Sequence, residues 1–236
     1  MTERSGRLGV GIVGAGRVGP VLGAALAGAG HAIVGISAVS DAARERADAM
    51  LPAVPILEVP RIVERSELVL LAVPEPELSG LVSGLATVGA WQPGQLVVHT
   101  APGVGVSVLM PALKAGAIPL AIHPAMSFTG TSIDLVRLRD SYCAVTAPAP
   151  VQPIGQALVV EMGAEPVLIA EADRPAWAEA VSTATMFPTA IVAQALGILD
   201  GLHVPDPGRV LAPLMRTAVE NALSAASPDI IPPDEL

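Results

Sequence analysis

The order of apolar runs and helical patterns constrains the fold of this chain more than any other feature. Short apolar runs, of the length of buried strands, lie at residues 8–13, 32–37, 54–57, 68–73, 95–99, 118–122, 142–146 and 166–169. Stretches with helical periodicity fall between most of them, at residues 18–29, 41–50, 75–88, 106–115 and 151–162. Strands that alternate with helices form parallel sheets covered by helices on both faces. We therefore expect an α/β fold with a doubly wound, mostly parallel sheet.

Towards the C-terminus the strands give way to helices alone. Two helices are predicted over residues 173–200 and 207–224. The first is expected to be interrupted near Pro188, because proline lacks the backbone N–H that a helix needs. We place one domain over residues 1–170 and a small all-helical domain over residues 171–236.

Charge and cysteine content exclude several classes of function. The chain has 13 basic and 22 acidic residues, a net charge of -9, so it has no basic stripe for nucleic-acid phosphates. Its single cysteine, Cys143, excludes a disulfide within the chain and a cysteine-cluster metal site. The first residues do not resemble an export signal, and the proline-rich tail at 227–236 is expected to be frayed. We expect a cytoplasmic protein without metal or nucleic-acid ligands.

The chain is unusually apolar, with 52% hydrophobic and only 15% charged residues. This surface must be covered by a core, a membrane or another subunit. The segments 78–113 and 180–199 carry no charge, but glycines and prolines break the first, and the second holds serine, threonine, proline and glutamine. Neither segment is typical of a membrane-spanning helix. We therefore expect no membrane association, and a homodimer formed through the C-terminal helices.

A glycine-rich turn follows the first predicted strand and opens the first predicted helix. The turn comprises Gly14, Ala15, Gly16, Arg17, Val18 and Gly19, a GxGxxG motif. In this context Gly14 permits the tight turn, Gly16 lets the backbone approach a pyrophosphate, and Gly19 lets the helix pack on the strand. We predict that these six residues bind a dinucleotide, as in a Rossmann-type fold. The alternative is an ordinary turn between strand and helix.

The end of the second predicted strand indicates which dinucleotide is preferred. NAD-binding sites usually have Asp or Glu at this point for the ribose hydroxyls, whereas this strand ends in Ser37. Ser37 and Ser40 could donate to a 2′-phosphate, and Arg44 or Arg46 could supply a cation. We therefore expect NADP, with NAD as the alternative. The two arginines are equally typical of the solvated face of a helix.

The turn after the apolar run at 68–73 lies at the edge of the sheet where ligands bind in open parallel sheets. Val73 and Pro74 in this turn are expected to line the ribose of the adenosine or of the nicotinamide. The alternative is that Pro74 simply starts the next helix.

Two histidines leave neighbouring strand ends beside the expected nicotinamide position. His99 ends the run at 95–99, and His123 follows the run at 118–122. A histidine there can donate to a carbonyl or carboxylate oxygen, or pass a proton to the alkoxide that forms as hydride arrives. We assign His123 as proton donor or substrate anchor, with the hydroxyls of Thr100 and Ser127 orienting the substrate. Alternatively, each histidine caps a strand end by bonding to backbone.

Three segments together resemble a known family. They are Gly-Ile-Val-Gly-Ala-Gly-Arg-Val-Gly at 11–19, Val-His-Thr-Ala-Pro-Gly at 98–103 and Ala-Ile-His-Pro-Ala-Met-Ser-Phe at 121–128. The chain resembles, to about residue 223, the Rossmann-like NADP-oxidoreductase proteins with an uncharacterised helical C-terminal domain. That family belongs to the 6-phosphogluconate dehydrogenase-like superfamily. Related enzymes are ketopantoate reductase, pyrroline-5-carboxylate reductase and prephenate dehydrogenase.

The resemblance implies hydride transfer between NADP(H) and a small carbonyl or imine that bears a carboxylate. It also implies that the domain over 1–170 binds the dinucleotide, while the domain over 171–236 closes the substrate site and forms the dimer. Such relatives carry a Tyr-His pair at the start of the long C-terminal helix and an Asn two turns later. Here Trp177 and Ala178 stand in place of the pair and Met186 stands near the Asn.

These departures leave more than one hypothesis. The first is an NADP(H)-dependent reductase in which the catalytic role has moved to His123 or to Glu179, Ser182 or Thr183. The alternative is a catalytically degenerate homologue that acts as a nucleotide-binding or purely structural dimer. Methyl transfer from S-adenosylmethionine is a weaker third hypothesis, because three glycines at this spacing suit a dinucleotide pyrophosphate better.

Overall fold

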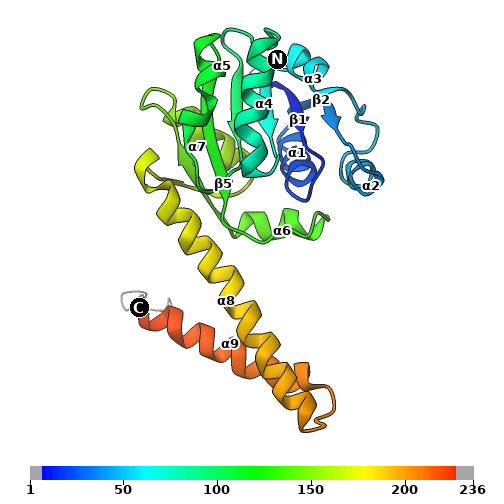
Figure 1. Ribbon diagram of the computed structural model, residues 1–236, viewed down its shortest axis with the longest axis vertical. Coiled ribbons are helices and arrows are strands. Elements are labelled where there is room, and N and C mark those ends of the chain that lie inside the picture. Colours follow the sequence, from blue (N-terminus) through cyan, green and yellow to red (C-terminus); the bar gives the residue numbers. More distant parts are fainter. Residues whose placement is uncertain (1–6, 227–236) are drawn as a thin grey trace, which may run out of the picture. The chain divides into compact units, whose positions relative to one another are not determined.

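The computed structural model describes residues 7–226, and within them the strands form one seven-stranded sheet (Figure 1). The strand order across the sheet is β2-β1-β3-β4-β5-β6-β7. All neighbouring strands run parallel except β5 and β6, which are antiparallel. The strands are β1 (Gly9–Val13), β2 (Ala32–Ser37), β3 (Leu68–Leu71), β4 (Leu96–His99), β5 (Ile118–Pro124), β6 (Tyr142–Thr146) and β7 (Glu165–Leu168). The expected doubly wound, mostly parallel sheet is confirmed.

Helices cover both faces of the sheet, and residues of the central strands β1, β3 and β4 alternate between two hydrophobic clusters, one on each face. On β3, Leu68 and Leu70 belong to one cluster, and Val69 and Leu71 belong to the other. The first cluster includes residues of α1 (Gly19–Gly28), α2 (Asp41–Met50), α6 (Ile133–Arg139) and α7 (Gln152–Glu161). The second includes residues of α3 (Val59–Arg65), α4 (Glu75–Thr87), the 3-10 helix η1 (Val106–Leu109) and α5 (Met110–Lys114).

Several local expectations were wrong in detail. The run at 54–57 contributes only an isolated bridge between Ile36 and Ile56, since Pro55 has no N–H to extend a ladder. The short helices α3 and α6 were not predicted. The helix α2 is capped by Ser40, which holds the extended cap conformation and whose hydroxyl accepts from the Ala43 N–H at 3.2 Å.

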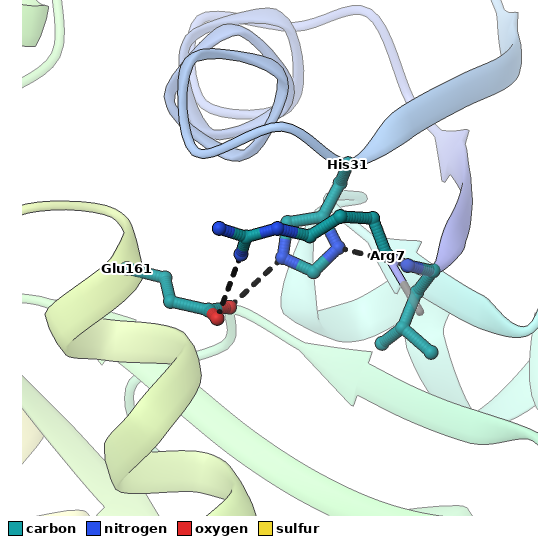
Figure 2. A network of polar contacts seen from close by, with 4 residues as sticks. Arg7, His31 and Glu161 are labelled. Carbon is teal, nitrogen blue, oxygen red and sulfur yellow. Dashed lines mark hydrogen bonds and ion pairs between the residues drawn. The ribbon is translucent and has the colours of Figure 1, made fainter. Parts of the chain in front are cut away.

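A polar cluster fastens the start of β1 to α7 at the edge of the sheet where β1 begins (Figure 2). Glu161 accepts from Arg7 Nη1 at 3.0 Å and lies 2.8 Å from His31 Nε2. Because the backbone N–H of Leu8 donates to His31 Nδ1 at 3.2 Å, the neutral imidazole carries its proton on Nε2 and donates it to Glu161. The cluster therefore links the start of β1 and the start of β2 to the end of α7.

Two long helices, α8 (Arg174–Gly201) and α9 (Pro207–Ala226), follow the sheet. Pro188 lies inside α8 without ending it, so the expected interruption was wrong. The division between two compact units falls within α8, after Glu179, and the domain boundary expected at residue 170 stays a prediction. None of the described residues from 180 to 226 is buried.

The stretch Glu171–Gly201 is long and apolar enough to cross a membrane by length and composition, which for one helix is weak evidence. The absence of membrane association stays a prediction. The start of the chain, where no export signal is expected, and the tail at 227–236 lie outside the described residues.

Candidate functional site

The glycine-rich turn has the geometry that its sequence predicts. Gly14 has φ of 105°, and a Cβ there would lie 2.5 Å from the carbonyl oxygen of Ala72. A Cβ on Gly19 would collide with the Gly14 carbonyl, so α1 can start this close to β1 only with glycine. Around Gly16, by contrast, a Cβ would meet nothing within 4 Å. The turn is thus tightly constrained at Gly14 and Gly19, and its backbone is open at Gly16.

The second strand and its helix support this turn. The hydroxyl oxygen of Ser37 accepts from the Gly14 N–H at 2.9 Å, and Arg46 Nε donates to the Ala15 carbonyl at 3.3 Å. Ser37 therefore lies at the turn, where it was expected. Ser40 follows three residues later in the chain and caps α2, and Arg44 is exposed on that helix. The assignment of these side chains to a 2′-phosphate stays a prediction.

Val73 and Pro74 lie in the turn between β3 and α4. Val73 borders the glycine turn, because its Cγ1 lies 3.4 Å from the position of a Cβ on Gly14. Pro74 is exposed at the N-cap position of α4, as the alternative interpretation has it. In the next residue, Glu75 Oε2 accepts from the Gly103 N–H at 2.9 Å and thereby links this turn to the loop after β4.

One pocket brings together the glycine turn and the ends of β4 and β5. Its volume is about 270 Å³, and it is lined by Arg17, Val18, Thr100, His123, Pro124, Met126 and Phe128. Ser127 is exposed and does not line it. A larger pocket of about 890 Å³ is lined by Arg7, His31 and Glu161, among others. It lies at the start of β1, whereas the glycine turn follows the end of that strand. Of these two, the smaller pocket combines residues of the glycine turn with a group able to donate to a substrate.

Trp177, at the start of α8, holds the imidazole of His123. Its indole Nε1–H donates to His123 Nδ1 at 3.1 Å, and the two rings meet edge to face at 6.3 Å between centroids and 82° between planes. Because Nδ1 accepts this bond, the proton of the neutral ring resides on Nε2. Burial, and then the positive charge of Arg174, lower the pKa of His123 to about 4. At neutral pH His123 is an uncharged hydrogen-bond donor.

His99 serves the backbone instead. It is fully buried, its Nε2 lies 2.9 Å from the Gly105 carbonyl, and its Nδ1 accepts from the Ala101 N–H at 3.2 Å. Both nitrogens are therefore used, and burial lowers the pKa of this imidazole to about 4. The geometry matches the alternative in which His99 caps the end of its strand.

A buried arginine that no sequence motif indicates, Arg174, lies close enough to His99 and His123 to act on both electrostatically. Arg174 is 0% exposed; its Nε donates to the Thr146 hydroxyl at 2.7 Å, and its Nη2 donates to the carbonyls of Ala121 at 2.6 Å and Ala144 at 3.2 Å. Its buried Nη1 has no partner among the described residues. Burial lowers the pKa of Arg174 to about 10, so the guanidinium is still charged at neutral pH.

Glu171 lies one turn before Arg174 and fixes the loop after β4. Its carboxylate accepts from the N–H groups of Val106 at 2.7 Å and Ser107 at 3.0 Å. Partial burial raises the pKa of Glu171, but the hydrogen bonds from Ser107 and Val106 outweigh this effect and hold the pKa below its ordinary value. These bonds hold η1 beside the Gly105 carbonyl to which His99 is bonded.

Asp134 fixes the loop after β5 against the glycine turn. This carboxylate is 0% exposed and accepts from the N–H groups of Thr129 at 2.7 Å and Gly130 at 2.8 Å, and from the Thr129 hydroxyl at 3.0 Å. Gly130 has φ of 82°, and a Cβ there would lie 3.2 Å from the Cα of Arg17. The loop that carries Met126 and Phe128 is therefore held next to the glycine turn.

Comparison with known proteins agrees with this architecture. Residues 2–124 match the Rossmann-like domain, which is more than half of the chain, and residues 141–231 match a domain of unknown function, DUF2520. No curated protein matches the chain in sequence.

Solved structures share the fold at low sequence identity. Protein TM1727 from Thermotoga maritima is 19% identical with a TM-score of 0.64, covering 90% of this chain and 77% of that one. The 1-pyrroline-5-carboxylate reductase of Streptococcus pyogenes is 17% identical with a TM-score of 0.68, covering 97% and 83%. The pyrroline carboxylate reductase of Plasmodium falciparum, solved with NADP bound, is 9% identical with a TM-score of 0.66, covering 96% and 82%.

Proposed function

Because this chain belongs to the Rossmann-like domain family, we propose that it is an NADP(H)-dependent oxidoreductase that reduces a small carbonyl or imine bearing a carboxylate. One observation carries the proposal: Arg17 and Val18 of the glycine turn line the same pocket as Thr100 and His123. The pocket thus joins a dinucleotide motif to a hydrogen-bond donor suited to a polarised double bond. The pyrroline carboxylate reductases with the same fold support this choice of reaction.

The glycine turn fits a dinucleotide. The open backbone at Gly16, directly before α1, leaves room for a pyrophosphate at a helix N-terminus. At the end of β2, Ser37 stands where an NAD site would have a carboxylate, and Arg46 lies close enough to bond Ala15. A hydroxyl and a cation favour the 2′-phosphate of NADP, and NAD is the alternative.

When bound, the nicotinamide supplies the hydride. The chain's own residues would then position the substrate. His123 donates its Nε2–H to the reacting oxygen or nitrogen, the hydroxyl of Thr100 orients the substrate, and the cation of Arg17 faces a carboxylate of the substrate or a phosphate. Because the pKa of His123 is about 4, a cationic imidazole is not available at neutral pH. We therefore assign His123 as substrate anchor, and the proton that completes reduction comes from solvent.

Two further assignments from the sequence stay proposals. Ser127 is exposed and would reach a substrate only through a change in the loop after β5. The homodimer is supported by the exposure of large apolar side chains on α8 and α9, for which a second copy of the chain is the partner we propose. These exposed side chains are Met186, Phe187, Ile191, Ile198, Val210, Leu214, Val219 and Leu223.

The proposal is tested by NADPH oxidation with a panel of 2-keto acids and cyclic imino acids. We expect at least one substrate to be reduced, and we expect His123→Ala to lower kcat/KM by about 10²-fold because a donor to the developing charge is lost. The exposed His203→Ala is the matched control and should leave kcat/KM unchanged. If NADPH binds but no member of the panel is reduced, the catalytically degenerate homologue becomes the better hypothesis.

A further inference from the structure

The hydrogen bond between Trp177 and His123 determines the tautomer of the imidazole as well as its position. A histidine in a pocket can offer either a donor or an acceptor to a ligand, depending on which nitrogen carries the proton. Here Nδ1 is occupied by the indole N–H at 3.1 Å, and the ring lines the pocket with Nε2 as its remaining polar atom. Indole nitrogen donates but never accepts, so the bond is compatible with one tautomer only.

The charge that acts on His123 from beneath the pocket is the positive charge of Arg174, which is itself coupled to the carboxylate of Glu171. Arg174 is bonded to the carbonyls of Ala121, two residues before His123 on β5, and Ala144, the register partner of His123 on β6. No carboxylate among the described residues lies within ion-pair distance of this guanidinium. Its field disfavours a cation in the pocket and favours negative charge that develops there.

We propose that Trp177 is a positioning residue that fixes His123 as an Nε2–H donor, and that the site is thereby specific for carbonyl over iminium substrates. This inference rests on the proposed function, since it concerns the substrate of that same pocket. Hydride addition to a carbonyl carbon moves the π electrons to oxygen, and the resulting alkoxide takes a proton from solvent to give an alcohol. The Nε2–H and the field of Arg174 both stabilise that oxygen as its charge grows.

An iminium substrate has the opposite requirements. Its nitrogen carries an N–H that needs an acceptor, and it begins as a cation that hydride transfer neutralises. The Nε2–H of His123 would face the N–H of the iminium, so that two donors meet without an acceptor. The buried cation Arg174 would also disfavour the positive charge of the iminium. The geometry of the site thus favours carbonyl over iminium substrates, a distinction that the fold alone does not make.

The tautomer is tested first, in the ligand-free protein, by long-range ¹H–¹⁵N NMR of ¹⁵N-histidine-labelled chain at neutral pH. The chain has four histidines, and the signals of His123 are assigned by their loss in His123→Gln. We expect wild-type His123 to be the Nε2–H tautomer. We expect Trp177→Phe, which keeps an aromatic ring but removes the donor to Nδ1, to give a mixture of the two tautomers.

Trp91→Phe is the matched control. Trp91 is buried and, like Trp177, donates its indole N–H, but to the Val82 carbonyl at 3.1 Å and away from His123. This variant should leave the tautomer and the pKa of His123 unchanged. An Nδ1–H tautomer in the wild-type protein, or a tautomer unaffected by Trp177→Phe, would overturn the positioning role.

Specificity is tested next with NADPH and matched substrates, a 2-keto acid series against cyclic imino acids of similar size. We expect kcat/KM for the keto acids to exceed that for the imino acids at least tenfold, and Trp177→Phe to reduce this ratio mainly through kcat. A preference for cyclic imines would overturn the specificity inference while leaving the oxidoreductase proposal intact. Failure of NADPH to bind at all would instead contradict the proposed function, whatever tautomer NMR reveals.

Discussion

The indole of Trp177 donates to Nδ1 of His123 across 54 positions of sequence, joining the first turn of α8 to the end of β5. In the sequence, the family resemblance implies a polar pair at this position, where the chain has Trp177 and Ala178. In the structure Trp177 is a polar partner nevertheless, through its N–H. The pocket therefore contains an oriented, neutral imidazole.

Stability should fall as the pH drops below 6.5. The pKa values of His99 and His123 are lowered to about 4 by burial, so between pH 6.5 and 4 the unfolded chain binds more protons than the folded one. The free energy of unfolding then decreases with decreasing pH, by up to about 3 kcal/mol for each histidine. Urea unfolding at pH 7, 5.5 and 4.5 measures this loss.

His123→Gln should weaken the pH dependence, and the exposed His203→Gln should leave it unchanged. Measurement above pH 4.5 separates the histidines from Glu171, whose pKa lies below its ordinary value. A free energy of unfolding that stays constant from pH 6.5 to 4.5 would contradict the buried, neutral state of both rings.

Asp134→Ala should destabilise the protein by about 3 kcal/mol, because the N–H groups of Thr129 and Gly130 lose a buried acceptor. The loop that these bonds hold against Arg17 should also loosen, which should raise KM more than it lowers kcat. Denaturant unfolding and steady-state kinetics measure the two effects. The exposed Asp140→Ala is the control, and equal effects of both changes would rule out the loop-fixing role of Asp134.

Charging the apolar surface of α8 should disturb self-association. Val192→Asp places a carboxylate beside Ile191, on a helix whose described residues beyond Glu179 are not buried. We expect the wild type to be a dimer by sedimentation equilibrium and the variant to aggregate, with its apolar surface uncovered. Asn221→Asp on α9 changes a polar exposed residue and should remain dimeric. A wild-type chain that is a monomer, or a Val192→Asp chain that remains a stable dimer, would refute the interface.

The sheet could be predicted from the sequence because its strands are short apolar runs with polar residues or proline nearby on either side, as at Leu68–Leu71. The short helix α6 could not, because its seven residues give too little periodicity after a stretch rich in serine and threonine. The locations of the glycine turn and of His123 were also predictable, because both directly follow apolar runs and ligands bind at the carboxyl ends of parallel strands.

The partners of His123 were not predictable, because they come from a distant helix. Arg174 precedes a proline at a helix start, a position typical of exposed arginines, yet it is fully buried under the strand ends. Its role depends on the antiparallel pairing of β5 with β6, which supplies the two carbonyls it binds. Likewise, the donor role of Trp177 follows from tertiary packing and leaves no local pattern.

The central claim is that the glycine turn binds a nicotinamide dinucleotide, and calorimetric titration with NADPH and NADH tests it most directly. We predict that NADPH binds with Kd on the order of micromolar and more tightly than NADH. Gly16→Asp should abolish binding without unfolding the chain, since a side chain there meets nothing within 4 Å, while Gly80→Asp on α4, equally unobstructed, should bind normally. Absence of binding for both nucleotides, or undiminished binding by Gly16→Asp, would contradict the claim.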